Sequence, residues 1–214
     1  MLTLYTFFRS STSFRLRIAL AWKGLAWEPR YVSLPKMEHR TTEYLALNPQ
    51  GGLPALVDEA GRAFTQSMAM IEYLDEIHPE PPLMPGTPEE RWYVRAVSQA
   101  IGCDMHPLNN VRVLKRLRGY GLTEEQVNRD WYGHWVAEGF RGLEGFLARE
   151  KRHGRYCLGE RFTMADVCLV PQVANAMRFQ CDLSPYPSVM RIYEACAALD
   201  AVRVADPSTQ ADKF

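Results

Sequence analysis

Residues 79–88 read PEPPLMPGTP, and five prolines in ten residues prevent a continuous helix or strand from crossing this segment. The patterns on its two sides differ. Short apolar runs alternate with helical patterns before it, whereas only long helical patterns follow it. A chain of 214 residues is long enough for two domains. We therefore predict an α/β domain over residues 1–80, an all-helical domain over residues 89–214, and a linker over residues 79–88.

The first domain is expected to contain strands, helices and one β-hairpin. Its hairpin is predicted from two short apolar runs around the turn Asp58–Gly61. Arg15 and Arg17 are interpreted as ordinary charges on a helix face. The other expected elements are strands at 2–8 and 28–33 and helices at 13–23, 42–47 and 67–78.

The second domain is expected to be built from helices alone. Thr163, followed three residues later by Asp166, matches a capping box, which we assign to helix initiation and not to chemistry. Residues 205–214 are polar and are expected to be frayed. The expected helices cover 89–118 with an interruption at Pro107, 123–150, 163–179 and 187–199.

Composition narrows the classes of function. The chain has 25 basic and 25 acidic residues, so charge does not favour a nucleic acid or a membrane surface as a partner. No apolar run approaches the roughly 20 residues of a membrane span, and the N-terminus lacks the pattern of a signal peptide. The five cysteines are an odd number without a CxxC motif, which favours a reducing, cytoplasmic location and argues against a zinc site. No metal is predicted.

The most informative motif is FRSSTSFRLRIAL, residues 8–20. Capping the predicted helix requires one hydroxyl, but residues 10–13 supply four. The spare hydroxyls lie where backbone amides and the helix dipole stabilise an anion, and a thiolate held there would have a lowered pKa. Because no cysteine of the chain is near, the thiol would belong to a ligand. Simple capping remains the alternative interpretation.

Two further positions could contact a ligand. Pro54 follows a glycine pair and precedes a strand; a cis bond there would present the backbone of Leu53 to an extended ligand, although an ordinary trans turn fits the pattern too. Gln66 and Ser67 open a helix, and the amides at that end suit a carboxylate. The alternative is that Ser67 is simply the N-cap.

The serine-rich motif, together with LNPQGGLPAL, QSMAMIEYLDE and FTMADVCLVPQVANAMRF, resembles the zeta class of glutathione transferases over nearly the whole chain. Many members of that class have Ser-Ser-Cys-Ser in the motif, whereas this chain has Thr12 in the cysteine position. A covalent or redox role for a protein cysteine is therefore excluded there, and a hydroxyl donor is kept.

The resemblance implies a thioredoxin-like N-terminal domain, an all-helical C-terminal domain, a homodimer and glutathione as the cofactor. Ser10 and Thr12 would face the sulfur and, with Arg9, form the catalytic set. The cofactor-binding residues implied are Ser10, Ser11, Thr12, His39, Gln50, Leu53, Pro54, Gln66, Ser67, His106 and Asn110. His106 and Asn110 are four residues apart and are expected on one helix face; His106 could instead be a structural residue beside Pro107.

The reaction implied is cis–trans isomerisation of a double bond by thiolate addition, bond rotation and elimination. Arginines suit the two carboxylates of such a substrate, and Arg9, Arg112 and Arg178 match the positions that the resemblance assigns to them. These arginines do not separate maleylacetoacetate from maleylpyruvate. The wide occurrence of tyrosine and phenylalanine catabolism favours maleylacetoacetate, with maleylpyruvate of gentisate catabolism as the alternative. A general glutathione transferase or haloacid dehalogenase and a non-enzymatic binding protein are further alternatives.

Overall fold

The computed structural model describes residues Met1–Phe214, which form two units with separate cores. One unit comprises Met1–Met84 together with Ala198–Phe214, and the other comprises Pro85–Ala197. The domain boundaries predicted from the sequence placed the whole of 89–214 in the helical part, whereas residues 198–214 belong to the unit that contains the sheet. None of the helices has the length and apolar character that a membrane-spanning helix requires.

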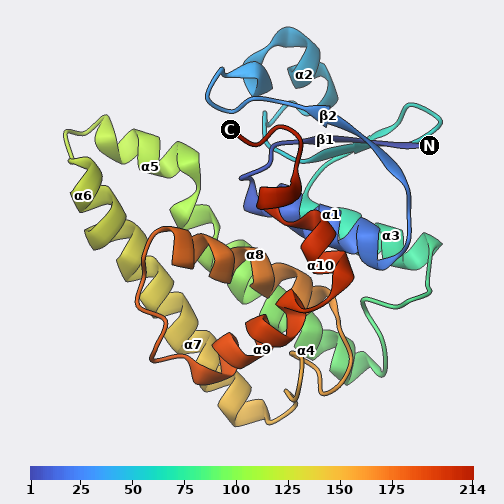
Figure 1. Ribbon diagram of the computed structural model, residues 1–214, viewed down its shortest axis with the longest axis vertical. Coiled ribbons are helices and arrows are strands. Elements are labelled where there is room, and N and C mark those ends of the chain that lie inside the picture. The colour runs from blue at the N-terminus through green and yellow to red at the C-terminus, as the bar shows by residue number, and fades with distance from the viewer. The chain divides into compact units, whose positions relative to one another are not determined.

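The first unit is built on a four-stranded sheet with the order β2-β1-β3-β4. The central strand β1 runs parallel to β2 and antiparallel to β3, and β3 forms the predicted hairpin with β4. Helices α1 and α3 lie side by side below the sheet in Figure 1, and α2 lies above it. This is the predicted thioredoxin-like arrangement. The elements are β1 (Leu2–Thr6), α1 (Ser11–Trp22), β2 (Trp27–Tyr31), η1 (Glu38–Arg40), α2 (Thr42–Leu47), β3 (Ala55–Val57), β4 (Ala63–Phe64), α3 (Ser67–Ile77), α10 (Asp200–Ala205) and η5 (Pro207–Thr209).

The interpretation of Arg15 and Arg17 as surface charges is wrong, because their exposed fractions are 2% and 0%. Helix α1 is covered by α3 and by α10, so it has no solvent face along this stretch. Arg17 donates to the carbonyls of Ala205 (2.9 Å) and Phe8 (3.0 Å) and to the hydroxyl of Thr6 (3.1 Å). Burial lowers the pKa of Arg17 to about 10. The guanidinium therefore fastens α10 to the end of β1.

The expectation of a frayed tail is also wrong. Residues 207–209 form a 3₁₀ turn, and the Asp212 carboxylate accepts a hydrogen bond of 2.9 Å from the amide of Phe8. The ring of Phe214 packs edge-to-face on that of Phe8, with centroids 5.2 Å apart. Figure 1 accordingly shows the end of the chain beside β1. The polar composition of the tail suggested disorder, but the Asp212 carboxylate binds the backbone next to β1, and Gln210 and Lys213 bind carbonyls within residues 204–208.

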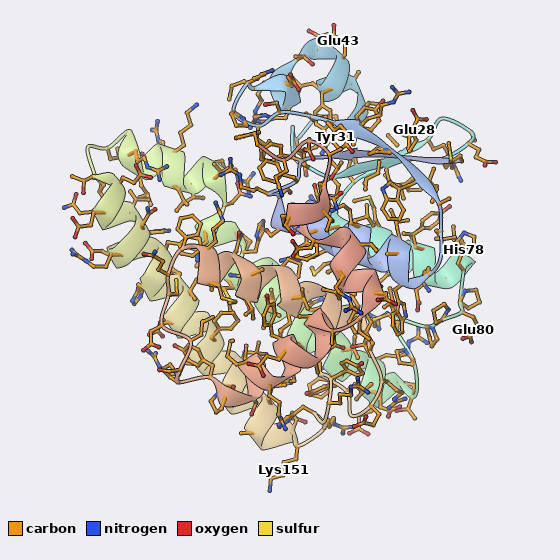
Figure 2. All side chains as sticks on the ribbon, viewed as in Figure 1. Glu28, Tyr31, Glu43, His78, Glu80 and Lys151 are labelled. Atoms are coloured by element: carbon orange, nitrogen blue, oxygen red, sulfur yellow. The ribbon has the colours of Figure 1, made fainter.

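A buried ion pair fixes the segment that follows α3. Lys23 donates to the Asp75 carboxylate (2.7 Å) and to the carbonyls of His78 (2.6 Å) and Pro81 (3.0 Å), which satisfies all three ammonium protons. The side chains of His78 and Glu80, which Figure 2 labels, are exposed. The first part of the proline-rich segment is therefore tied to the first unit.

The second unit contains helices only, as predicted, but its long helices are divided. The pattern over 89–118 becomes α4, a π-helical turn, a 3₁₀ turn and α5, because Pro107 lacks an amide proton and Asn110 caps a new helix. The pattern over 123–150 contains a second π-helical turn. The elements are α4 (Pro88–Gln99), η2 (Ala100–Met105), η3 (Pro107–Asn109), α5 (Val111–Arg118), α6 (Glu124–Gln126), η4 (Val127–Gly133), α7 (His134–Glu150), α8 (Met164–Arg178) and α9 (Pro187–Ala197).

The predicted capping box at Thr163 is present and lies in the core of the second unit. Asp166 is fully buried and accepts hydrogen bonds from the amides of Cys157 (2.7 Å) and Thr163 (2.8 Å). Burial raises the pKa of Asp166, while these hydrogen bonds lower it. The box joins the start of α8 to the preceding loop, which agrees with a role in helix initiation.

Candidate functional site

The hydroxyl motif forms a directed chain of hydrogen bonds at the start of α1. Ser10 is the N-cap, and its Oγ accepts from the amide of Ser13 at 3.2 Å. Thr12 donates to the carbonyl of Leu53 at 2.7 Å, and the Ser10 and Thr12 hydroxyls are 2.9 Å apart. A carbonyl only accepts, so the single Thr12 proton points to Leu53 and Ser10 must donate to Thr12. A thiolate that takes a hydroxyl proton here would have to replace one of these two contacts.

The same hydrogen bond brings the motif to the proline turn. The peptide bond between Leu53 and Pro54 is cis. Of the two alternatives left open by the sequence, a cis bond and a trans turn, the first is therefore present. Two buried side chains hold the loop before it: Tyr44 and Asn48 donate to the carbonyl of Gly52, at 2.5 Å and 2.8 Å. Sequence reasoning missed both side chains. Asn48 immediately before a Pro-Gln-Gly-Gly turn was the available signal, because asparagine side chains commonly stabilise such turns.

The start of α3 is open to an external acceptor. Gln66, not Ser67, is the N-cap, and it makes no capping hydrogen bond, so the alternative that Ser67 is a simple N-cap is wrong. Gln66 adopts a left-handed φ of 68°, and its side chain donates to Gln50 at 2.7 Å. Left-handed backbone at a non-glycine residue is strained and is found preferentially at functional sites. Ser67 is buried in the first turn, and His39 is half-buried in η1.

In the second unit, the structure brings His106 and Asn110 together, but not in the way expected. The two residues do not share a helix face: His106 ends the π-helical turn η2, and Asn110 is the N-cap of α5. The 3₁₀ turn that begins at Pro107 lies between them. Their side chains nevertheless approach, with Asn110 Nδ2 3.4 Å from His106 Nε2. Asn110 Oδ1 also accepts from the amide of Arg112 at 3.1 Å.

The three predicted arginines are exposed and divide between the units. Arg9, directly before Ser10, belongs to the first unit, and its guanidinium carbon lies 4.9 Å from the Phe8 ring centre and 5.0 Å from that of Phe214. Arg112 and Arg178 belong to the second unit. Arg112 lies in the first turn of α5, beside the cap that Asn110 provides.

Arg178 ends α8 and lines a cavity of about 600 Å³ within the second unit. It donates to Asn175 at 3.3 Å, and its guanidinium lies 4.5 Å from the Phe179 ring centre. A second cation in the lining, Arg129, forms ion pairs with Glu125 and Asp130. The lining residues are Glu125, Asn128, Arg129, Gly133, Arg178, Phe179, Gln180, Cys181 and Asp182.

The comparisons with known proteins agree with the geometry. Residues 9–77 match the family described as glutathione S-transferase, N-terminal domain. The chain is 47% identical to a maleylpyruvate isomerase of a Ralstonia species, over 98% of each chain, and 45% identical to a maleylacetoacetate isomerase of Pseudomonas aeruginosa, over 98% of this chain and 97% of the relative.

Two solved structures extend this similarity to the fold. A maleylpyruvate isomerase, described as a bacterial zeta-class glutathione S-transferase, superposes with a TM-score of 0.95 at 46% identity and covers 99% of this chain and 100% of its own. A maleylacetoacetate isomerase from Methylobacterium extorquens, solved with malonate and glutathione bound, gives a TM-score of 0.94 at 38% identity over 97% of each chain. The chain belongs to the zeta class of the glutathione transferase family, and the predicted fold class is confirmed.

Proposed function

We propose that the protein is a glutathione-dependent cis–trans isomerase that converts maleylacetoacetate to fumarylacetoacetate in tyrosine and phenylalanine catabolism. The observation that carries the proposal is the hydrogen-bonded chain from Ser10 through Thr12 to the carbonyl of Leu53. It places a helix N-terminus with hydroxyls directly beside the backbone that precedes a cis proline. Relatives at 45% and 47% identity carry the two isomerase names and support the reaction class.

The residues of the first unit fit glutathione, an extended anionic tripeptide. The first turns of α1 and α3 contain no acidic residue, so both helix N-termini favour negative charge. The open start of α3, at Gln66 and Ser67, would hold the γ-glutamyl carboxylate. Leu53, placed before Pro54, would pair with the cysteinyl backbone. Gln50 and His39 would hold the glycyl end, and Ser10, Ser11 and Thr12 would surround the sulfur.

Glutathione, when bound, supplies a thiolate that adds to an activated double bond, which lets the bond rotate before the thiolate leaves. The chain has to lower the pKa of that thiol. The amide of Thr12 lies in the first turn of α1, where no intrahelical acceptor exists, and the helix dipole places partial positive charge at the same point. The Ser10 proton becomes available to the sulfur if its contact with Thr12 is exchanged, and the Thr12 proton if its contact with the Leu53 carbonyl is exchanged.

The remaining assignments concern the substrate, which is a dianion. Arg9, Arg112 and Arg178 are assigned to its carboxylates, because an arginine fork binds a carboxylate through two N–H groups. Asn110 and His106 are assigned to the region near the thiol and are already in contact with each other. An enolate formed on addition requires hydrogen-bond donors or cations, and these residues carry both.

Maleylpyruvate is the second candidate substrate, because one relative and one solved structure with that name match the chain at 47% and 46% identity. The deciding experiment compares kcat/KM for maleylacetoacetate and maleylpyruvate, with and without glutathione. A tenfold preference, about 1.4 kcal/mol in the transition state, identifies the substrate. If neither substrate is isomerised in the presence of glutathione, the isomerase proposal is refuted, and a general transferase or dehalogenase becomes the better interpretation.

We also propose a homodimer in the cytoplasm. All five cysteines are free, which is usual in a reducing compartment. Sedimentation equilibrium of the purified protein tests the oligomeric state, and a single species of about 24.5 kDa would refute the dimer.

A further inference from the structure

We propose that Phe214 is a positioning residue for Arg9, which it holds against Phe8 in the orientation that receives a substrate carboxylate. The inference rests on the proposed function, in which Arg9 binds one end of the dianion. It extends that function to the last residue of the sequence, 205 positions away from the arginine it serves.

The geometry of the contact is specific. The guanidinium carbon of Arg9 is 4.9 Å from the ring centre of Phe8 and 5.0 Å from that of Phe214, and the two ring centres are 5.2 Å apart. Three nearly equal distances form a triangle, so both rings contact the guanidinium from one side. The rings themselves meet edge-to-face at 71°. Arg9 is exposed, so an anion can reach the part of the guanidinium that the two rings do not cover.

Phe214 is anchored independently of Arg9. Its ring also packs against Phe7, with centroids 6.4 Å apart, and the Asp212 carboxylate binds the amide of Phe8 at 2.9 Å. Lys213 donates to the carbonyl of Ser208 at 2.9 Å, which ties the last residues to the 3₁₀ turn η5. Phe7 and Phe8 are buried at 6% and 5% exposure, so Phe214, which is itself 77% exposed, rests on core side chains.

The anchored ring reduces the freedom of an otherwise flexible side chain. An exposed arginine samples many rotamers, and binding a carboxylate would normally cost the entropy of ordering it. A cation–π contact on two rings orders Arg9 before the substrate arrives. The carboxylate assigned to Arg9 is the one farther from the reacting double bond, so this contact would be equally strong in the ground and transition states. Loss of Phe214 should therefore raise KM and leave kcat unchanged.

The test measures kcat and KM for the preferred maleyl dianion in Phe214→Leu, Phe214→Tyr, Arg9→Met and Tyr120→Leu. Phe214→Leu should raise KM about two- to fivefold, the effect of losing one exposed cation–π contact. Phe214→Tyr keeps the ring and should retain the wild-type KM. Tyr120→Leu is the matched control, because Tyr120 is an exposed ring that carries Arg116 at 4.7 Å in the second unit; its KM should not change.

A second readout does not depend on turnover. The NMR signal of the Arg9 Nε–H group, assigned by its loss in Arg9→Met, should carry a ring-current shift that Phe214→Leu removes and Phe214→Tyr keeps. If Arg9→Met raises KM but Phe214→Leu alters neither KM nor this signal, the inference is overturned and the proposed function stands. If Arg9→Met leaves KM unchanged, Arg9 does not bind the substrate and the inference is overturned, whereas the isomerase proposal depends only on turnover of the two substrates by the wild-type protein.

Discussion

Helices α1 and α8 both have a hydroxyl residue at the N-cap, but different groups bind the free amides at their N-termini. At α8, the Asp166 carboxylate accepts from the amide and the hydroxyl of Thr163, at 2.8 Å and 3.0 Å, and both residues are fully buried. At α1, only the Ser10 hydroxyl caps the helix, and no acidic residue lies in the first turn. The protein's own carboxylate therefore neutralises one helix end, whereas the positive end of the other stays available.

We expect this difference to separate a structural cap from a binding site. A carboxylate in the first turn satisfies the free amides and offsets the helix dipole, which stabilises the fold and leaves nothing for a ligand. A hydroxyl cap satisfies one amide and adds no charge. The sequence motifs look alike, since each has a hydroxyl residue at the cap, but we expect only the α1 motif to lower the pKa of a bound thiol.

The largest effect is expected from Asp166→Asn. The amide group places two donors where the carboxylate accepted hydrogen bonds from Cys157 and Thr163, so at least one buried amide loses its acceptor. The free energy of unfolding should fall by about 2–4 kcal/mol. Urea denaturation measures this, with Asp182→Asn as the control, because Asp182 caps Ser184 at the surface. Equal losses in the two variants would contradict the distinction between a buried and an exposed cap.

The second-largest effect is expected on kcat, in the variants Ser10→Ala and Thr12→Ala. Each removes one member of the hydroxyl chain, and a lost donor to a developing charge costs about 3 kcal/mol in the activation barrier, or roughly a hundredfold in kcat. Thr123→Ala is the matched control, since Thr123 is a hydroxyl N-cap on the surface. If both motif variants retained full turnover under saturating glutathione, simple capping would explain the motif.

The substitution Ser10→Asp makes the start of α1 resemble that of α8, because it places a carboxylate at the helix N-terminus. Aspartate is as good an N-cap as serine, so stability should be kept, but a carboxylate beside the sulfur should raise the pKa of bound glutathione by about one unit. Ser10→Asn is an equally good cap without charge and serves as the control. Thiolate absorbance as a function of pH measures this pKa. Identical titration curves for the two variants would show that the sulfur does not lie at this helix end.

The smallest effect concerns the third helix start, α3. Gln66→Gly relaxes the left-handed backbone but removes the hydrogen bond to Gln50, which is worth about 1 kcal/mol. We expect KM for glutathione to rise about fivefold with no loss of thermal stability. Lys151→Gly, which relaxes a φ of 54° in the second unit, is the control and should leave KM unchanged. A normal KM in Gln66→Gly would remove Gln66 from the glutathione site.

The local sequence pattern predicted most of the helices and strands, because periodicity and capping depend on residues that are close together in the sequence. The helix Thr42–Leu47 and the hairpin at Asp58 were placed correctly. The π-helical turn at Ala100–Met105 was missed, since one extra residue in a turn barely alters the helical pattern. The burial of Arg17 depends on a carbonyl 188 positions away, which no local pattern contains.

In the candidate site too, local features could be predicted from the sequence, whereas contacts between distant residues could not. The start of α1 was identified because the excess of hydroxyls is local, and the cis bond at Pro54 was one of two stated alternatives. The hydrogen bond from Thr12 to Leu53 crosses 41 positions, and the contact of Arg9 with Phe214 crosses the whole chain. These contacts depend on tertiary packing, so residue types alone could not reveal them.

The hydrogen bond between Arg17 and Ala205 has a consequence for synthesis on the ribosome. Residues 1–84 leave the ribosome before residues 85–205, so the Arg17 guanidinium lacks one of its carbonyl acceptors until residue 205 emerges. An unsatisfied buried cation is costly, so the nascent sheet and its helices should stay loosely packed until then. The part of the chain that contains the sheet is thus translated before the helical unit, but it can complete its packing only after that unit has been made.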